Sequence, residues 1–405
     1  MRTEPAPPVD LLTWYVTPQS LSTRLAGVHL TYLSKPGIAD WDSVSPEIHL
    51  LVENADLGKA SRVLLLGGGN GLAALGLHSR FPGLEIGLYE INFVAQTLSE
   101  KNISLHQAQQ QIRIVHRLDE IPAESLEAAA IFLPKGIGLC RRWLLDLYAL
   151  LQPGGELYLV GSNQGGVQSV IRDAEAVFQK ATILAYKKGH RLARLIRPHT
   201  SLQSAPPWAS ESGIKPGTWA EARYTTRQGE FQMLSHPGVF SYQKLDPATK
   251  MVLDHWEIDA ADILADLGCG FGALGITASY QAAQVDLFDS NILAVETSQK
   301  NLETLQQTNA RALPGDVLSS AGSRRYTQIA TNPPFHTGMA RDHYLPRVFM
   351  AQSRRQLVPG GRLLLVSNRF LNYEVELRKL FPDVRVQAAD SRYILFCARK
   401  SESAG

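Results

Sequence analysis

The sequence predicts an α/β protein made of two tandem Rossmann-like domains, each with a mainly parallel sheet. One observation is that the chain repeats itself: VLLLGGGNGLAALGL, from Val63 to Leu77, is similar to ILADLGCGFGALGI, from Ile263 to Ile276. A second similar pair, ALLQPGGELYLVGSN and RQLVPGGRLLLVSNR, follows these at nearly the same separation. The other observation is that each half alternates strand, glycine turn and helix, as doubly wound α/β domains do.

The length of the chain also favours two domains. At 405 residues it can form two separate hydrophobic cores. The stretch HTSLQSAPPWASESGIKPGTW is rich in Pro, Ser and Gly and has no sustained periodicity, which is typical of a linker. We therefore expect a first domain over residues 1–198, a linker over 199–220 and a second domain over 221–405.

Composition and charge describe an ordinary globular protein. Lys and Arg, at 40, barely exceed Asp and Glu, at 38, so the net charge does not indicate a polyanionic partner, although it allows a local basic patch. The cysteines Cys140, Cys269 and Cys397 are far apart, which favours reduced thiols and no metal. There is no apolar run long enough for a membrane span and no signal-peptide pattern, so we expect a cytoplasmic protein. As a separate expectation, we take the protein to be a monomer.

The elements of the first half follow in order. VLLL is expected to form a buried strand, and the glycines after it lead into a helix over LAALGL. GLYE is a second strand that ends in Glu90, and IFLPKG is a strand whose end is marked by Pro134. ELYLVGS is a later strand that follows a Pro-Gly-Gly turn.

The second half repeats this order with more polar residues. ILADL is a strand that carries Asp266 just before the glycines, VDLFD is a strand that ends in Asp289, and GDV, with Asp316, closes a third strand. YTQIA is a buried strand that stops at TNPPFH. The first half has Leu65 in place of Asp266. It also has Leu133 in place of Asn332 and Gly136 in place of Phe335, so we expect the chemistry in the C-terminal half.

The glycine loop and the three acids favour S-adenosylmethionine as the cofactor. Such a loop by itself serves NAD, FAD, S-adenosylmethionine or a plain tight turn. Asp266 would collide with a dinucleotide pyrophosphate but could meet a cationic amino acid moiety. Asp289 is placed to accept from ribose hydroxyls, and Asp316 from an adenine amino group. Each acid alone could be a solvated residue at a strand end, whereas three on successive strands favour S-adenosylmethionine over NAD.

The segment ATNPPFHTG predicts a site for an amino group. The side-chain oxygen of Asn332 and the carbonyl of Pro333 can accept the two hydrogens of one –NH₂ group, and Pro334 stiffens the corner. These acceptors would direct the nitrogen lone pair at a methyl sulfonium. Phe335 would stack on the planar group that carries the amine. A plain Asn-Pro turn is the alternative, and His336 either contacts the substrate or caps the next segment.

These residues resemble the class I S-adenosylmethionine-dependent methyltransferases with an Asn-Pro-Pro-aromatic motif. NPPFHTG, preceded by HPGVFSYQKLD (His236 to Asp246), is more narrowly similar to the ribosomal RNA guanine-N2 methyltransferases of the RsmC and RlmG type. That family is also a tandem duplication, whose degenerate N-terminal copy helps folding and RNA binding. The resemblance covers nearly the whole second half at motif level and the first half mainly in architecture.

The resemblance implies a site and a substrate. It implies that the enzyme methylates guanine N2 of ribosomal RNA, with the base taken from a loop or splayed out of a duplex. The substrate residues implied are Asn332, Pro333, Pro334 and Phe335. The cofactor residues implied are Asp266, Gly268, Cys269, Gly270, Gly272, Asp289, Asp316, Phe240 and Ser241. Methylation of adenine or protein glutamine, and a non-catalytic RNA-binding assembly factor, are the alternatives.

Basic residues near the end of the first domain are candidates for contacting phosphates. A solvated charged face is the plainer interpretation of the same residues. They are Lys187, Lys188, Arg191, Arg194 and Arg197.

Overall fold

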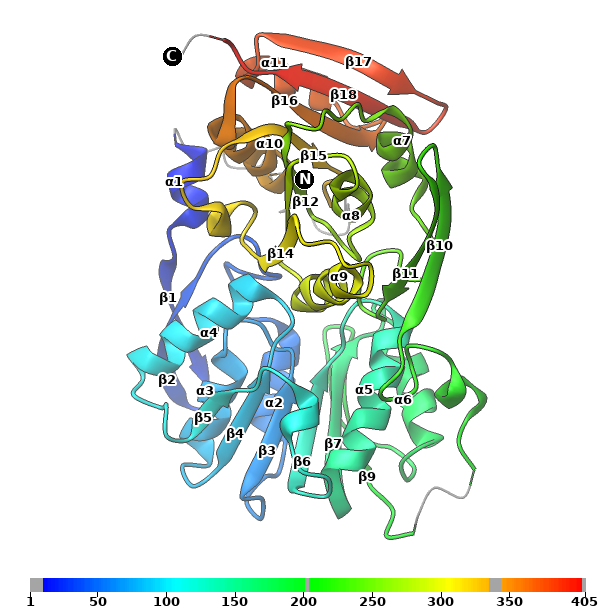
Figure 1. Ribbon diagram of the computed structural model, residues 1–405. Coiled ribbons are helices and arrows are strands. Elements are labelled where there is room, and N and C mark those ends of the chain that lie inside the picture. Colours follow the sequence, from blue (N-terminus) through cyan, green and yellow to red (C-terminus); the bar gives the residue numbers. More distant parts are fainter. Residues whose placement is uncertain (1–9, 201–203, 335–343, 403–405) are drawn as a thin grey trace. The chain divides into compact units, whose positions relative to one another are not determined.

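The computed structural model describes residues 10–200, 204–334 and 344–402, so the expected roles of Phe335 and His336 fall outside the described residues. The chain divides into two compact units (Figure 1). The N-terminal unit consists of residues 18–219. The C-terminal unit begins at Ala220 and also includes the described residues up to Thr17.

Among its described residues, the N-terminal unit contains a hairpin, a seven-stranded sheet and five helices. The hairpin pairs β1 (Gln19–Leu25) with β2 (Val28–Ser34). The sheet has the spatial order β5 (Ile112–Ile114), β4 (Glu85–Tyr89), β3 (Arg62–Leu66), β6 (Leu126–Phe132), β7 (Leu151–Ser162), β9 (His190–Ile196), β8 (Thr182–Lys187). The helices are α2 (Pro46–Asn54), α3 (Leu72–Arg80), α4 (Phe93–Leu105), α5 (Ile137–Leu150) and α6 (Val167–Glu175), with short 3₁₀ turns η1 (Leu118–Glu120) and η2 (Pro207–Ser210).

The C-terminal unit repeats this arrangement. Its hairpin pairs β10 (Ala220–Thr226) with β11 (Gly229–Ser235). Its sheet has the order β14 (Ala310–Pro314), β13 (Gln284–Asp289), β12 (Ile263–Leu267), β15 (Tyr326–Thr331), β16 (Leu357–Asn368), β18 (Tyr393–Arg399), β17 (Asp383–Ala389). The helices are α1 (Leu11–Val16), α7 (Pro247–His255), α8 (Ala273–Ser279), α9 (Ile292–Thr304), α10 (Tyr344–Gln356) and α11 (Tyr373–Leu380), with the 3₁₀ turn η3 (Ser319–Ala321).

Both sheets are mainly parallel and both are covered by helices. In the seven-stranded sheet of the C-terminal unit, the described pairs that involve β18 are antiparallel and the others are parallel. Helix α8 contacts both α7 and α9, and helix α10 contacts both α1 and α11. Strands covered on both faces need continuous apolar runs, and β3 and β12 are buried over four consecutive residues each. The predicted α/β class with two tandem Rossmann-like domains is confirmed.

The position of α1 differs from the expected domain boundaries. Tyr15 of α1 is buried in the core of the C-terminal unit, and its hydroxyl donates to Asp316 Oδ1 at 2.7 Å. The neighbouring residues Leu11 and Leu12 pack against the same core. These apolar residues therefore stabilise the second sheet. The N-terminal unit does not include them, although the expected first domain over 1–198 did.

The segment expected to be a linker is packed against the N-terminal unit. Trp208, in η2, is buried, and the Arg141 guanidinium lies 5.3 Å from its ring centroid. Arg142 Nη1 donates to the carbonyls of Gly213, at 3.1 Å, and Lys215, at 3.2 Å. Both arginines belong to α5. The Pro, Ser and Gly content of this stretch thus reflects an irregular path along a helix rather than a free connection.

Candidate active site

The glycine loop of the C-terminal unit turns the chain from β12 into α8. Gly268, Gly270 and Gly272 have φ values of 80°, 56° and 92°, which favour glycine. Gly272 is the N-cap residue of α8, and a Cβ there would lie 2.5 Å from Ile276 Cδ1. The Cys269 thiol is buried beside Ser298, and burial raises its pKa well above the ordinary range. The loop therefore presents backbone rather than side chains.

Asp266 lies at the end of β12, beneath the start of α8. Its Oδ2 accepts from the Gly275 N–H at 2.8 Å, while its Oδ1 is buried without a hydrogen-bond partner among the described residues. Burial raises the pKa of this carboxyl from 3.8 to about 7, against the opposing effect of the Gly275 hydrogen bond. An acid in this state would be stabilised by a cation or a donor at its free oxygen.

Asp289, at the end of β13, supports the glycine loop. Its Oδ2 accepts from the Gly270 N–H at 2.9 Å and its Oδ1 from the Asn291 N–H at 2.8 Å. Burial raises its pKa, and these backbone hydrogen bonds oppose the rise. Each carboxylate oxygen can accept more than one hydrogen bond, so Asp289 keeps acceptor capacity for a ligand.

Asn332 directly follows β15, and neighbours fix the orientation of its amide. Its Nδ2 donates to Asp246 Oδ2 at 3.0 Å and to Thr249 Oγ1 at 2.9 Å. An ionised carboxylate only accepts hydrogen bonds, so the nitrogen must face Asp246 and the oxygen must face away. The Asn332 Oδ1 is buried and has no partner among the described residues. The amide thus offers one unsatisfied acceptor.

One cavity of about 30 Å³ brings most of the predicted residues together. It lies where the strand order reverses, between β12 and β15, which is where open α/β sheets bind ligands. Asp246 and Thr249 line it too. The predicted residues that line it are Phe240, Ser241, Asp266, Gly268, Cys269, Gly270 and Asn332.

The remaining predicted residues lie outside the lining of this cavity. Gly272 lies at the end of the loop, and Asp289 accepts from the loop's Gly270 N–H. Pro333 is buried and Pro334 is exposed. Asp316 follows β14 and accepts from the Tyr15 hydroxyl, a partner far away in sequence. At the rim of the cavity, Phe240 is 55% exposed.

The N-terminal unit keeps the scaffold of this loop. Glu90 occupies the place of Asp289, and its two oxygens accept from Gly69 N and Asn92 N, each at 3.0 Å. Burial raises its pKa to about 7. Asn102 bonds to both backbone groups of Leu33, as Asn301 does to Leu234. Because these hydrogen bonds occur in both units, their role in stabilising the fold is enough to explain them.

The catalytic candidates are replaced in the N-terminal unit, with one correction to the expected alignment. Leu66 pairs with Ile131 as Leu267 pairs with Thr331, so the counterpart of Asn332 is Phe132 and not Leu133. The error arose because the strand ends were aligned on their prolines. The Phe132 ring packs against the glycine loop, where its Cε2 lies 3.0 Å from an ideal Cβ on Gly68.

The basic residues near the end of the N-terminal unit divide into two groups. Arg194 pairs with Glu156 at 3.2 Å, and Arg197 pairs with Glu124 at 2.8 Å. The exposed Lys187 and Lys188 lie at the turn between β8 and β9, and Arg191 bonds to Asn163 Oδ1. At least two of the five cations are therefore engaged in holding the fold together.

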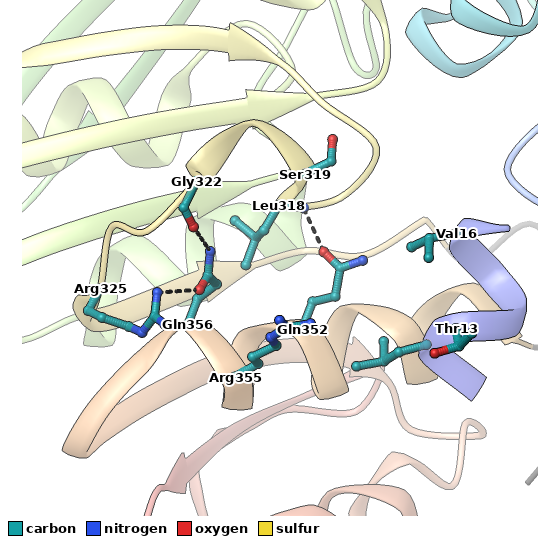
Figure 2. A pocket seen from close by; sticks show the side chains of 10 residues that line it. Thr13, Val16, Leu318, Ser319, Gly322, Arg325, Gln352, Arg355 and Gln356 are labelled. Atoms are coloured by element: carbon teal, nitrogen blue, oxygen red, sulfur yellow. Dashed lines mark hydrogen bonds between the residues drawn. The ribbon is translucent and has the colours of Figure 1, made fainter. Parts of the chain in front are cut away.

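A larger cavity of about 280 Å³ lies elsewhere in the C-terminal unit (Figure 2). It is lined by residues of α1, η3 and the second half of α10, and Gln352 Oε1 there accepts from the Leu318 N–H at 3.0 Å. Arg325, which also lines it, immediately precedes β15. This cavity is therefore near the amino end of the strand whose carboxyl end carries Asn332, and none of the predicted site residues line it.

Sequence reasoning missed Asp246, Thr249 and Tyr15. Asp246 is the N-cap residue of α7 and Thr249 lies in its first turn, and in the sequence an Asp-Pro pair indicates only the start of a helix. Their counterparts in the N-terminal unit are Ser45 and Ile48. Ser45 has a hydroxyl in place of the Asp246 carboxylate, and Ile48 has no side-chain acceptor. Comparison of the two halves at these positions would have found them, as it found Asp266.

Other proteins share this architecture. The family model of the methyltransferase small domain matches residues 29–194 and 230–397. The "Ribosomal RNA small subunit methyltransferase C" of Pseudomonas aeruginosa is 31% identical over 69% of this chain and 81% of its own length. That of Pseudoalteromonas atlantica is 30% identical over 68% of this chain and 78% of its own length.

A solved structure from T. thermophilus covers nearly the whole chain. It is described as a 16S rRNA N2 guanine methyltransferase, RsmC, in complex with AdoMet and guanosine. It is 26% identical, has a TM-score of 0.80, and the match covers 96% of this chain and 99% of that one. No helix among the described residues is long and apolar enough to span a membrane, and they contain no group of three metal-ligating side chains. The chain belongs to the methyltransferase small domain family, together with the ribosomal RNA small subunit methyltransferases C.

Proposed function

We propose that the chain transfers a methyl group from S-adenosylmethionine to the exocyclic N2 amine of a guanine in small-subunit ribosomal RNA. The observation that carries the proposal is the buried, unsatisfied Oδ1 of Asn332 at the switch point of the sheet. We propose the small ribosomal subunit because the relatives named above are described as small subunit methyltransferases. A substrate of this kind would place the protein in the cytoplasm.

The residues around the cavity fit the cofactor. Asp266 Oδ1 is an acceptor without a partner among the described residues, and it would meet the cationic amino acid end. Asp289 would accept from ribose hydroxyls, and Asp316 would accept from the adenine amino group. The backbone of the loop from Gly268 to Gly270 would lie along the ligand, while Phe240 and Ser241 would cover it.

The methyl transfer follows from two acceptors held in place before reaction. S-adenosylmethionine, when bound, supplies an electrophilic methyl group. Asn332 Oδ1 and the Pro333 carbonyl would accept the two hydrogens of the guanine amine, which is a poor nucleophile because its lone pair is delocalised. Holding these hydrogens favours a pyramidal nitrogen whose lone pair points at the methyl carbon. Phe335 would stack on the base.

Asp246 and Thr249 would act as positioning residues. They hold the Asn332 nitrogen, so its oxygen faces the substrate without rotating at the moment of reaction. Asp246 is itself fixed as the N-cap of α7, where its Oδ2 accepts from Ala248 N at 2.9 Å and Thr249 N at 3.1 Å. The N-cap of α7 would thus help to fix the orientation of the Asn332 oxygen that accepts from the substrate.

The N-terminal unit would support folding and RNA binding rather than methyl transfer. It lacks the carboxyl of Asp266, having Leu65 there, and the Phe132 ring packs against its glycine loop. The exposed Lys187 and Lys188 are available to phosphates.

The proposal is tested by methyl transfer from labelled S-adenosylmethionine to separated small and large ribosomal subunits and to deproteinised RNA. Nucleoside mass spectrometry of the product identifies the modified base. We expect N2-methylguanosine from small-subunit RNA. Label in protein or in methyladenosine would overturn the acceptor, and label from the large subunit would overturn the choice of RNA.

A further inference from the structure

We propose that an exposed turn in the C-terminal unit binds the RNA segment next to the substrate base, with an aromatic stack and two guanidinium contacts. The surface, called here the Arg-Phe rim, consists of Arg369, Phe370 and Arg392. The proposal rests on the function proposed above and names a contact outside the methyl-transfer site.

The sheet places the Arg-Phe rim at the same edge as Asn332. Thr331 pairs with Leu365 in the parallel ladder of β15 and β16, and Asn332 follows Thr331. β16 continues to Asn368, and the rim comes next. At a rise of about 3.3 Å per residue, Arg369 lies roughly 10 Å beyond Asn332 along the strand direction. Nucleotides that flank a base at Asn332 would come within reach.

The local backbone holds the rim in place. The Leu371 N–H donates to the Asn368 carbonyl at 3.0 Å, which closes a turn with Arg369 and Phe370 at its centre. The Arg369 N–H donates to the Arg392 carbonyl at 2.9 Å, which ties this turn to the residue before β18. Both arginines and the phenylalanine therefore share one ordered surface.

Phe370 has no packing role that explains its position. Its side chain is 74% exposed, more than any other large apolar side chain among the described residues. An exposed aromatic ring costs solubility, and its flat face suits stacking on an unpaired base. Because every base has such a face, the contact would not depend on sequence.

The charges of the Arg-Phe rim favour an anionic partner. Arg369 Nη1 donates to the Asp390 carbonyl at 2.8 Å, and the Arg392 guanidinium lies 5.2 Å from the Tyr393 ring centroid. Neither guanidinium forms an ion pair within the described part of the chain. Asp390 Oδ1 accepts from the Arg392 and Tyr393 N–H groups, each at 2.7 Å. Two cations beside one anion leave a net positive charge for phosphates.

The N-terminal unit shows that the fold does not require these side chains. There Asn163 and Gln164 take the places of Arg369 and Phe370, and the Asn163 N–H donates to the Gly189 carbonyl at 2.8 Å. The same backbone contact to the neighbouring strand end therefore forms with no aromatic ring and no guanidinium at those two places. The side chains of the rim are specific to the unit that carries Asn332.

The experiment measures binding of small-subunit ribosomal RNA and methyl transfer separately. Phe370→Ala should weaken RNA binding and raise KM by about tenfold or more, from the loss of one stacked base, with kcat at saturating RNA nearly unchanged. Phe370→Trp should restore both. Arg369→Gln and Arg392→Gln should each lower the slope of log affinity against log salt by about 0.7. Val386→Ala and Arg385→Gln, exposed on β17, are the matched controls.

Several outcomes would overturn the proposed role of the Arg-Phe rim in binding RNA. Unchanged RNA affinity in Phe370→Ala and both arginine variants would do so, as would equal losses in the β17 controls. A loss seen only on assembled subunits and not on naked RNA would assign the surface to a ribosomal protein. If RNA binding responds as expected but no N2-methylguanosine forms, the rim stands and the proposed function fails.

Discussion

Asn332 and Asp246 are 86 positions apart in the chain, yet Asn332 Nδ2 lies 3.0 Å from Asp246 Oδ2. The contact joins the end of β15 to the first turn of α7. With the Thr249 hydroxyl it occupies both hydrogens of the amide and leaves Oδ1 buried and unsatisfied. This pair is therefore the geometric basis of the proposed reaction.

Asn332→Ala removes one of the two acceptors for the substrate amine. We expect turnover to fall by about a hundredfold or more, as when an enzyme loses one preorganised polar group at its reaction centre. Cofactor affinity should stay nearly intact. Single-turnover methyl transfer and calorimetric cofactor binding measure the two quantities, and unchanged turnover would contradict the role of Asn332.

Thr249→Val removes one partner of the Asn332 nitrogen without changing the size of the side chain. The amide keeps its Asp246 contact, so kcat should fall by about three- to tenfold, the worth of one hydrogen bond, with little change in KM for RNA. Thr249→Ser should recover most of the loss. If valine and serine behave alike, the hydroxyl does not position Asn332.

We expect Asp266 to make cofactor binding depend on pH. Its pKa of about 7 means that it is partly protonated in the ligand-free protein, whereas a cationic ligand favours the carboxylate. Affinity should rise as pH increases from about 6 to 8, with proton release on binding. Calorimetry in buffers of different ionisation enthalpy detects that release. Asp266→Asn should bind weakly at every pH and release no proton.

We expect the same carboxyl to make the C-terminal unit less stable at high pH. Its folded pKa lies above its ordinary value of 3.8, so its contribution to the free energy of unfolding is greatest below that value and is lost as pH rises through about 7. Asp266→Asn should be more stable than the wild type at pH 8 by a few kcal/mol, and close to it at pH 4. Urea denaturation at both pH values checks this, and a variant less stable than the wild type at pH 8 would contradict it.

Asp289 and Glu90 form a matched pair for separating folding from binding. Each accepts two backbone hydrogen bonds at its own glycine loop. Replacing either by alanine should destabilise its unit by similar amounts. Only Asp289→Ala should also lower cofactor affinity, by tenfold or more, because ribose hydroxyls lose a charged acceptor. Equal effects on affinity would mean that Asp289 acts only through the loop.

The sequence predicted the features that depend on local pattern. Both sheets and both glycine turns follow from apolar runs and glycine spacing, and Asp266 was found because its counterpart is Leu65. The partners of Asn332 were not found, because such contacts arise only when distant elements meet. Phe132 was misaligned by one residue, since strand ends carry no periodicity that fixes their register. Trp208 shows that a proline-rich stretch can still pack when it carries an apolar anchor.

The place of α1 also sets the order in which the protein can fold during synthesis. Tyr15 is synthesised 301 residues before its hydrogen-bond partner Asp316. The N-terminal unit, continuous from Pro18 to Trp219, is complete long before the second sheet exists. Helix α1 therefore cannot pack against the core of the C-terminal unit until the whole N-terminal unit has been synthesised. A fragment that begins at Ala220 would therefore lack a buried part of its own core, however well its boundary matches the sheet.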